Sequence, residues 1–476
     1  MIMKRKITFM IIMILTLSMV TSFTPRVHAQ RETIKIGAIG PLAIPTGVDM
    51  QHGAELAVAQ INAGDGVDVA GTAYDFELLL ETTSGSTGIP DAATGQASIT
   101  KLAGDGAVAM LGGFRTEVVA TMQFVMNVTG IPFLGVGSTS PIITEYFYRV
   151  GPVNGTTLAR NLIALYGTFL VAAPHNITDV VVVREDAVWT EAISAAVKGA
   201  LEGLFGMTVD TATVDAIPEG ASGSDVAAAM SAIDSANYDA ILPLFSAPVG
   251  QRVSEQWAAL GLNEDLYLAG INVAAQDSDY LEDTGDAAIG EITLLAAPPD
   301  QNPTSTSAAF KTAYEAEYGE LPTYTAFAAF DAVMILKDAI ERAGSFASAD
   351  IHAVLPDTDY KGVSATIRFT SESSAGQVAS ASVPDTLKPF NNTVAHDLYT
   401  TSTIGVSGFP FNQPYFAQWF ADGSQGAIWA GTSTGYKSAE APSYAPESDD
   451  GFLPGFEGIF VAFAIGTFVV LRKRKN

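Results

Sequence analysis

Short apolar segments typical of buried strands alternate with segments of helical periodicity, and this alternation occurs twice along the chain. In the first series, residues 34–39 predict a strand that ends at a Gly-Pro turn, and apolar residues then recur at helical spacing over 54–61. The other elements expected in this series are strands at 76–80, 107–111 and 131–136, and helices at 91–102 and 118–127. This order predicts a parallel sheet with helices on both faces.

The second series begins near residue 180 and repeats the same order. We expect strands at 180–183, 209–214, 240–244, 266–269 and 291–296, helices at 190–204, 226–235, 251–260, 308–318 and 326–343, and a last strand-like segment at 365–369. Two such series predict an α/β fold with two doubly wound parallel-sheet lobes joined by a hinge. Because open parallel sheets bind ligands outside the carboxyl ends of their strands, the cleft between the lobes is the expected binding site.

The two ends of the chain predict export and attachment to a membrane. Residues 1–29 combine a basic segment, an apolar run and small residues, the pattern of a secretory signal peptide, with an uncleaved anchor as the alternative. Residues 455–471 are apolar except for Glu457 and predict a membrane segment, and 472–476 form a basic cytoplasmic tail. Residues 437–454 are rich in Ser, Pro, Ala, Asp and Glu and predict an extended stalk. The lobes are therefore expected on the extracellular face of the membrane, anchored at the C-terminus.

The charge of the chain argues against nucleic acid as a partner. The chain has 24 basic and 51 acidic residues, and eight of the basic ones lie in residues 1–29 and in the C-terminal tail. The remainder has 16 basic residues against 51 acids, a net charge of −35. Such a surface repels nucleic acid and anionic lipid headgroups.

The residue types that catalysis and metal binding require are absent or scattered. The sequence has no cysteine, which excludes disulfides, thiolate zinc sites, iron–sulfur clusters and thiol nucleophiles. Its five histidines stand singly, without metal-ligand spacing, and neither G-x-S-x-G nor G-x-x-x-x-G-K occurs. The sequence thus predicts no enzyme, no catalytic residue, no cofactor and no metal site.

Five segments, taken in order, resemble a known family. They read IKIGAIGPLAIPTGVDMQHGAELAVAQINAGDG (34–66), AVAMLGGFRTE (107–117), GIPFLGVGSTSP (130–141), YRVGPVNGTTLARNL (148–162) and YKGVSATIRFT (360–370). Together they resemble the branched-chain amino-acid-type (Leu/Ile/Val-binding-like) substrate-binding proteins of ABC transporters, which have the type I periplasmic binding protein fold. The resemblance extends over residues 33–435. In addition, PGFEG at 454–458 resembles the PGF-type sorting signal of archaeal surface proteins, in which a lipid replaces the apolar segment; a permanent span is the alternative.

The resemblance implies that each lobe is built from two parts of the chain. Lobe one would comprise residues 33–152 and 298–346, and lobe two would comprise 153–297 and 347–436, with 360–370 as a late lobe-two strand. Crossovers are expected near 151–156, 296–302 and 345–350. Residues 371–434 form a longer and more aromatic ending than is usual in the family.

In lobe one, the resemblance implies a ligand held by hydroxyl and backbone N–H groups of two loops. Thr116 belongs to the first loop, and Gly137, Ser138 and Thr139 belong to the second. Strand ends next to a helix N-terminus expose donors that suit a carboxylate. Ordinary capping of helices by the two threonines is the alternative. Thr46 is a weaker candidate.

Arg115 departs from the small residue that is common at this place in the amino-acid binders. It either clamps an anionic ligand group or forms an ion pair with Glu117 or with an acid of lobe two.

Lobe two is expected to close over the ligand with Trp189, Ser246 and Asn272. Trp189 would stack on the ligand, with a place in the core as the alternative. At the position of Asn272 the amino-acid binders often have an acid that pairs with the ligand ammonium. The neutral amide therefore leaves amides and short carboxylates open beside amino acids.

These inferences predict an extracellular solute-binding protein of an ABC-type importer. It would capture a small polar solute and deliver it to a permease in the membrane. The alternatives are a ligand-sensing ectodomain that signals through a separate membrane partner, and a surface-layer or adhesion module.

Overall fold

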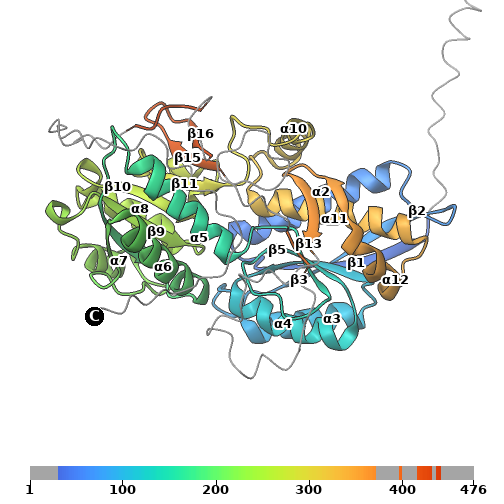
Figure 1. Ribbon diagram of the computed structural model, residues 1–476. Coiled ribbons are helices and arrows are strands. Elements are labelled where there is room, and N and C mark those ends of the chain that lie inside the picture. Colours follow the sequence, from blue (N-terminus) through green and yellow to red (C-terminus); the bar gives the residue numbers. More distant parts are fainter. Residues whose placement is uncertain (1–30, 371–395, 399–414, 431–435, 441–476) are drawn as a thin grey trace, which may run out of the picture.

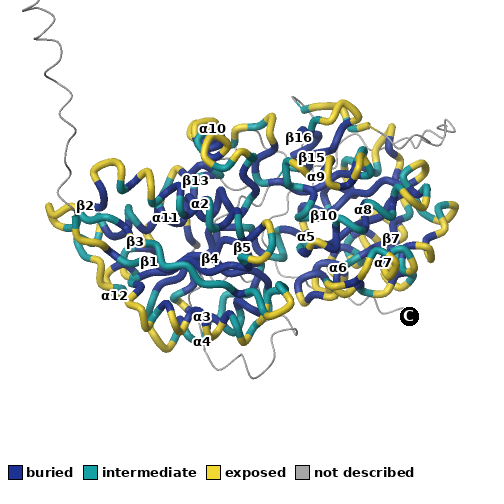
Figure 2. The backbone as a smooth tube through the Cα atoms, turned by 180° about the vertical axis from the view of Figure 1, so that it is seen from behind, coloured by how far each residue is buried: buried dark blue, intermediate teal, exposed yellow. Residues whose placement is uncertain are grey.

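The computed structural model of the chain describes residues 31–370, 396–398, 415–430 and 436–440, and these form two lobes, each with a central sheet between helices (Figure 1). Figure 2 shows that the buried backbone follows the sheets and the inner sides of the helices, while the exposed residues lie at the periphery of both lobes. The expected α/β architecture with two largely parallel sheets is therefore confirmed.

Lobe one contains a six-stranded sheet in the order β2-β3-β1-β4-β5-β6. Its strands are β1 (Thr33–Gly40), β2 (Val67–Val69), β3 (Thr72–Thr82), β4 (Ala109–Phe114), β5 (Phe133–Gly137) and β6 (Phe147–Arg149). All neighbouring strands pair in parallel except β2 and β3, which form an antiparallel hairpin. All four expected strands of the first series are present.

Helices cover both faces of this sheet because side chains alternate between the faces along each strand. Ile34 and Ile36 of β1 point into one core, whereas Ile39 points into the other. The helices of lobe one are α2 (Pro45–Ala63), α3 (Ala92–Gly104), α4 (Thr116–Thr129), α10 (Ser307–Tyr318), α11 (Tyr324–Ala343) and α12 (Ser348–Val354). α2 and α11 pack on the first face, and α3 and α4 pack on the second.

Lobe two contains a seven-stranded sheet in the order β16-β15-β11-β10-β9-β7-β8. Its strands are β7 (Asp179–Arg184), β8 (Thr208–Asp210), β9 (Ala240–Phe245), β10 (Tyr267–Asn272), β11 (Ile292–Leu295), β15 (Tyr415–Trp419) and β16 (Gln425–Trp429). Its helices are α5 (Gly155–Ala164), α6 (Val188–Ala200), α7 (Gly223–Met230), α8 (Val249–Ala259) and α9 (Tyr280–Asp283). α5 and α6 pack on one face, and α7 and α8 pack on the other.

The expected assignment of residues 347–370 to lobe two is wrong. α12 and the small sheet β12 (Asp359–Lys361), β13 (Thr366–Thr370) and β14 (Asp397–Leu398) pack on lobe one (Figure 1, orange). The reason is burial, since Ile351, Leu355 and Ile367 are completely buried in the core that contains α2 and α11. The late strands that join lobe two are β15, which pairs antiparallel with β11, and β16, which pairs antiparallel with β15.

The chain crosses between the lobes after β6 and again after β11, as expected. The expected crossing near 345–350 is not observed, because α11 continues into α12 within lobe one. The later passage from lobe one to lobe two lies between Leu398 and Tyr415, outside the described residues.

Several predicted segments lie outside the described residues. These are the signal peptide at 1–29, the membrane segment at 455–471, the basic tail at 472–476 and most of the stalk. The first stalk residues are described and belong to lobe two: the Lys437 N–H donates to the Ala427 carbonyl, and the Glu440 N–H donates to Gln418. Across the described ranges, no helix has both the length and the apolar character needed to cross a membrane.

The close packing of α2 on α11 gives a stability prediction. A Cβ on the buried Gly53 would lie 2.8 Å from the Cα of Ala326 and even closer to its carbonyl oxygen. Gly53→Ala should therefore push the helices apart and lower the free energy of unfolding by about 1–3 kcal/mol. Gly199→Ala is the matched control, since Gly199 is also helical but a Cβ there meets nothing within 4 Å. It should stabilise by about 0.5–1 kcal/mol. Urea unfolding followed by circular dichroism measures both, and equal stability of the two variants would contradict this packing.

Candidate ligand-binding cleft

A cavity of about 110 Å³, as swept by the centre of a water-sized sphere, lies between the two lobes at the carboxyl ends of their strands. This volume is roughly ten times the volume that a single buried water requires, so a small organic molecule fits. The cavity is lined by Phe114, Arg115, Thr116, Gly137, Ser138, Thr139, Val150, Gly151, Pro152, Val153, Leu158, Trp189, Ser246, Ile271, Val273, Gln276, Leu294, Leu295, Ala296, Tyr324, Ala328 and Ser364.

The structure brings together seven of the eight site residues expected from the sequence. They are Arg115, Thr116, Gly137, Ser138, Thr139, Trp189 and Ser246. They come from the ends of four strands in two lobes, and the parallel arrangement places all these ends at the cleft. Their role as ligand contacts stays a prediction.

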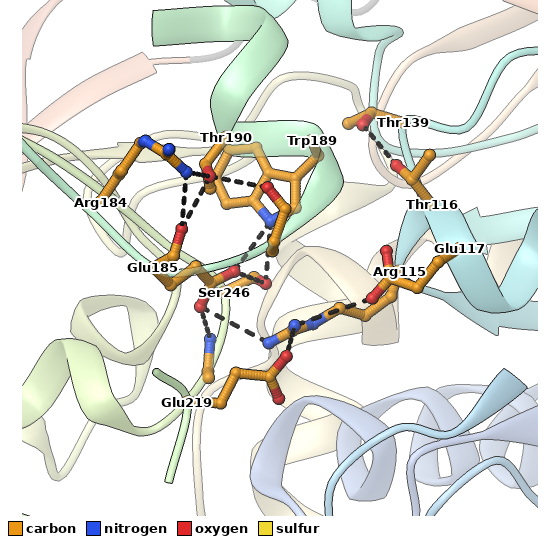
Figure 3. Close-up of polar contacts among 12 residues, drawn as sticks. Arg115, Thr116, Glu117, Thr139, Arg184, Glu185, Trp189, Thr190, Glu219 and Ser246 are labelled. Carbon is orange, nitrogen blue, oxygen red and sulfur yellow. Dashed lines mark hydrogen bonds and ion pairs between the residues drawn. The ribbon is translucent and has the colours of Figure 1, made fainter. Parts of the chain in front are cut away.

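The first lobe-one loop delivers the N-terminus of α4 to the cavity. Thr116 is the first residue of α4, and Arg115 before it makes no side-chain cap. The first N–H groups of this helix therefore have no capping side chain, which leaves donors for an anion at the positive end of the helix dipole. Thr116 does not act as a cap; its hydroxyl lies 3.5 Å from that of Thr139 (Figure 3).

The second lobe-one loop passes directly against the first. A Cβ on Gly137 would lie 2.5 Å from the carbonyl oxygen of Gly113, so glycine is required where the two loops approach each other. The Ser138 hydroxyl accepts a bond of 3.0 Å from the Ser140 N–H and is thus used within the loop. Thr139 presents its hydroxyl beside Thr116 instead.

Glu185, which follows β7, organises the lobe-two wall of the cavity. Its carboxylate accepts bonds from the Trp189 indole N–H at 2.8 Å, the Ser246 hydroxyl at 2.5 Å and the Ala247 N–H at 2.9 Å. The Trp189 ring is 8% exposed and contributes to the lobe-two core while one side lines the cavity. Trp189 therefore has a place in the core, and its contact with a ligand stays a prediction.

Arg115 forms the interlobe ion pair that was one of its two alternatives. Its side chain is 1% exposed, and its guanidinium contacts Glu219, Glu185 at 3.5 Å and Glu117 at 3.9 Å (Figure 3). Glu185 and Glu219 belong to lobe two, so this contact spans the cleft. Burial raises the pKa of the Glu219 carboxyl, and the charge of Arg115 opposes this rise. With its charge already paired, Arg115 is a poor clamp for an anionic ligand.

Asn272 does not reach the cavity, so its expected role is wrong. It is completely buried inside lobe two, where its amide donates to Glu291 at 2.8 Å and to the Tyr280 hydroxyl at 2.9 Å. Asn272 is the last residue of β10, and its side chain points toward α8, away from the cleft. The weaker candidate Thr46 is also absent from the lining; its carbonyl accepts a bond from Thr325 within lobe one.

Three polar lining residues were not expected from the sequence. Tyr324 begins α11, Ser364 follows β12, and Gln276 lies after β10. Burial raises the pKa of the Tyr324 hydroxyl, so this group stays protonated. The Gln276 amide N–H donates to the Leu294 carbonyl at 3.1 Å, and its oxygen is buried without a partner among the described residues. Ser364 lies in the segment YKGVSATIRFT, but no pattern in the sequence marked it, Tyr324 or Gln276 as a residue of the site.

The cavity wall is mainly apolar, with hydroxyl and amide groups at a few points. Among the described lining residues, Arg115 alone carries a charge, and it is paired. The wall therefore suits a ligand with an apolar body and one polar end.

One group of side chains with metal-ligand chemistry lies apart from this cavity. The ligand atoms of Asp49, His52 and Glu320 lie within 4.8 Å of one another. Asp49 already accepts bonds from the hydroxyls of Tyr314 and Thr323, and His52 stacks on Tyr318 with 3.9 Å between ring centroids. Glu320 lies 3.6 Å from the Nδ1 of His52, so the three side chains connect α2 with the segment that contains α10 and α11.

Comparisons with known proteins agree with this geometry. Residues 33–383 match a family model described as "Periplasmic binding protein", which is more than half of the chain. No curated protein matches the chain.

Several solved structures have a similar fold. A leucine-binding protein from Thermotoga maritima has 19% identity and a TM-score of 0.61, over 82% of this chain and 97% of that one. A solute-binding protein from R. palustris in complex with benzoate has 17% identity and a TM-score of 0.63, over 87% and 99%. A branched-chain amino acid transporter substrate-binding protein from Streptococcus pneumoniae, in complex with isoleucine, has 19% identity and a TM-score of 0.59, over 71% and 92%. At these identities the likeness concerns the fold.

The cluster around Asn272 gives a pH prediction. Burial raises the pKa of Glu291 from 4.5 to about 7. The folded state thus binds this proton more tightly than the unfolded state, so the contribution of Glu291 to stability is full below pH 4.5 and is lost as the pH rises to about 7.

Glu291→Gln mimics the protonated form, so the variant should gain stability relative to the parent over this pH window, by up to about 1.4 kcal/mol per pH unit. All four tryptophans lie in lobe two, so urea unfolding followed by tryptophan fluorescence between pH 4.5 and 7.5 measures the effect. A stability difference that does not change with pH would contradict it.

Proposed function

Because the chain belongs to the periplasmic binding protein family, we propose that it captures a small organic solute between its lobes and delivers it to the permease of an ABC transporter. The observation that carries the proposal is the cavity at the facing carboxyl ends of two parallel sheets, lined by residues of both lobes. The family and the similar structures are solute-binding proteins and not enzymes.

We propose that the solute is a carboxylate with an apolar body. The uncapped N-terminus of α4, with the hydroxyls of Thr116 and Thr139, offers donors to one carboxylate. Apolar side chains such as Val153, Leu158 and Ile271 surround the rest of the cavity. The benzoate complex and the isoleucine complex of the similar structures both hold ligands of this general kind.

Among the described lining residues, none is a carboxylate that could pair with the ammonium group of an α-amino acid; the acceptor left without a partner is the neutral amide oxygen of Gln276. The lobe-two acid Glu185 bonds two residues of the lobe-two wall of the cavity, but both of its carboxylate oxygens already accept bonds, from Trp189, Ser246, Ala247 and Arg115. An ammonium would have to displace one of these donors. This supports a simple carboxylate over an amino acid.

Closure of the lobes would complete the site. Trp189 and Ser246 of lobe two face the lobe-one loops only while the lobes are together, and Arg115 bonds Glu219 and Glu185 in the same state. We propose that the ligand binds the lobe-one loops first and that hinge closure then brings the lobe-two wall onto it.

We place the binding protein on the extracellular face of the cell membrane, with its C-terminal segment, or a lipid that replaces it, as the anchor. The segments on which this proposal depends are outside the described residues. The permease of the transporter would be its membrane partner.

A matched ligand pair tests the solute class. 4-Methylpentanoate and L-leucine differ only in the ammonium group, and calorimetric titration measures both affinities together with that of benzoate. We expect one reversible site per chain, tighter binding of 4-methylpentanoate than of L-leucine, and recovery of the ligand unchanged. Tighter binding of L-leucine would overturn the carboxylate assignment, and steady conversion of the ligand would overturn the binding function itself.

The two ends of α4 provide a matched pair of variants. Thr116→Val removes a hydroxyl from the cavity, and loss of a bond to a charged group costs about 1.5–3 kcal/mol, or at least about tenfold in affinity. Thr129→Val removes a hydroxyl that bonds the Val125 carbonyl at the other end of the same helix and should leave the affinity unchanged. Titration with benzoate and melting of the unliganded variants are the measurements. If both variants bind equally well, Thr116 is not a ligand contact.

A further inference from the structure

A fully buried arginine holds the second lobe-one loop from behind. Arg149 ends β6 and is completely buried. Two of its guanidinium nitrogens donate to the carbonyl oxygens of Ser138 and Ser140, on either side of Thr139. Both loop carbonyls are therefore directed toward Arg149.

This direction determines where the Thr139 N–H points. A trans peptide unit is planar, and its C=O and N–H groups point in opposite directions. The Ser138 carbonyl and the Thr139 N–H belong to one such unit, so the N–H points away from Arg149. Thr139 lines the cavity, and its N–H has no hydrogen-bond partner among the described residues. By holding the Ser138 carbonyl, the Arg149 guanidinium thus directs the Thr139 N–H toward the cavity.

The charge of Arg149 is balanced by a residue far along the chain. Asp397 in β14 is 1% exposed and accepts a bond of 2.8 Å from the Arg149 Nε. β14 is held in place by its pairing with β13, and the Arg149 N–H donates to the His396 carbonyl at 3.0 Å. A buried guanidinium without this carboxylate would be strongly destabilising.

Asp397 also connects the loop to the first crossover between the lobes. Its second oxygen accepts a bond of 3.2 Å from the Asn154 amide. Asn154 in turn caps α5, the first helix of lobe two, by accepting a bond of 2.9 Å from the Thr157 N–H. A continuous buried network therefore runs from the ligand loop through Arg149 and Asp397 to the segment that leads into lobe two.

From this network we infer that Arg149 and Asp397 are positioning residues for ligand capture: they hold the 138–140 loop so that Thr139 offers its N–H and hydroxyl to the ligand carboxylate. The inference rests on the proposed function. It also assigns a role to the chain beyond residue 395, since this distant segment completes the site without touching the ligand.

Arg149→Lys separates positioning from folding. Lysine keeps the positive charge beside Asp397 but lacks the planar fork that engages two carbonyls at once. The full-length protein carrying this substitution should fold, bind benzoate about tenfold more weakly or worse, and show faster hydrogen exchange of the Ser140 amide, which is bonded within the loop. Glu291→Gln is the control, because Glu291 is equally buried and hydrogen-bonded but lies away from the cavity; it should bind benzoate like the parent.

The double variant Arg149→Met with Asp397→Leu provides the second arm. Replacement of a buried ion pair by apolar residues of similar size often leaves stability unchanged or higher. We expect this variant to melt near the parent temperature and still to lose affinity and loop protection. If the double variant does not fold, the Arg149→Lys variant alone tests whether Arg149 positions the loop.

Two results would overturn the inference: folded variants that bind benzoate like the parent, or parent-like amide exchange in both at Ser140, whose N–H donates to the Ser138 hydroxyl within the loop. The exchange measurement needs no ligand. If the parent protein binds none of the carboxylates, the proposed function fails, and the exchange rates still show whether Arg149 holds the loop.

Discussion

The architecture of the site depends on the direction of the strands in the two sheets. In a parallel sheet all strands end at the same edge, so loops that are far apart in sequence meet there. Here β4 and β5 of lobe one deliver Thr116 and Thr139, and β9 of lobe two delivers Ser246. The crossovers after β6 and β11 place these two edges face to face. Without this constraint the same residues would be scattered polar positions on a surface.

Buried charges connect the parts that this architecture brings together. Arg115 and Arg149 both lie in lobe one at 3% exposure or less, and each pairs with a carboxylate far away in sequence. Arg115 reaches Glu185 and Glu219 across the cleft, whereas Arg149 joins the ligand loop to Asp397 and the first crossover. Since a buried charge is costly unless it is paired, these contacts favour one arrangement of the lobes and one conformation of the loop. The cavity itself is left apolar, apart from donors that are already oriented.

The periodicity of the sequence predicted most strands and helices, and the family resemblance predicted seven lining residues of the cavity. The failures have a common cause. Asn272 stands at a strand end, where a ligand contact was expected, but the choice between the cleft and the interior depends on Ser254, Tyr280 and Glu291, which accept bonds from its amide nitrogen inside lobe two. Residues 347–370 look like another unit of the second series, yet their apolar side chains fit the core beside α11. Neither choice is visible in the local pattern, because each depends on how the side chains pack in space.

The sequence alone determined the properties that depend on the order and type of residues. Alternating apolar periods specify parallel sheets, glycines specify tight strand ends, and the absence of cysteine and of catalytic motifs removes whole classes of chemistry. Tertiary structure alone decided which charges meet. Arg115 was equally suited to a ligand or to an acid, and only the approach of Glu185 and Glu219 made it an interlobe link. Arg149 and Asp397 are 248 positions apart, and no spacing rule predicts their contact. The physical reason is that electrostatic pairing depends on distance in space and on burial, and both are set only when the lobes have packed.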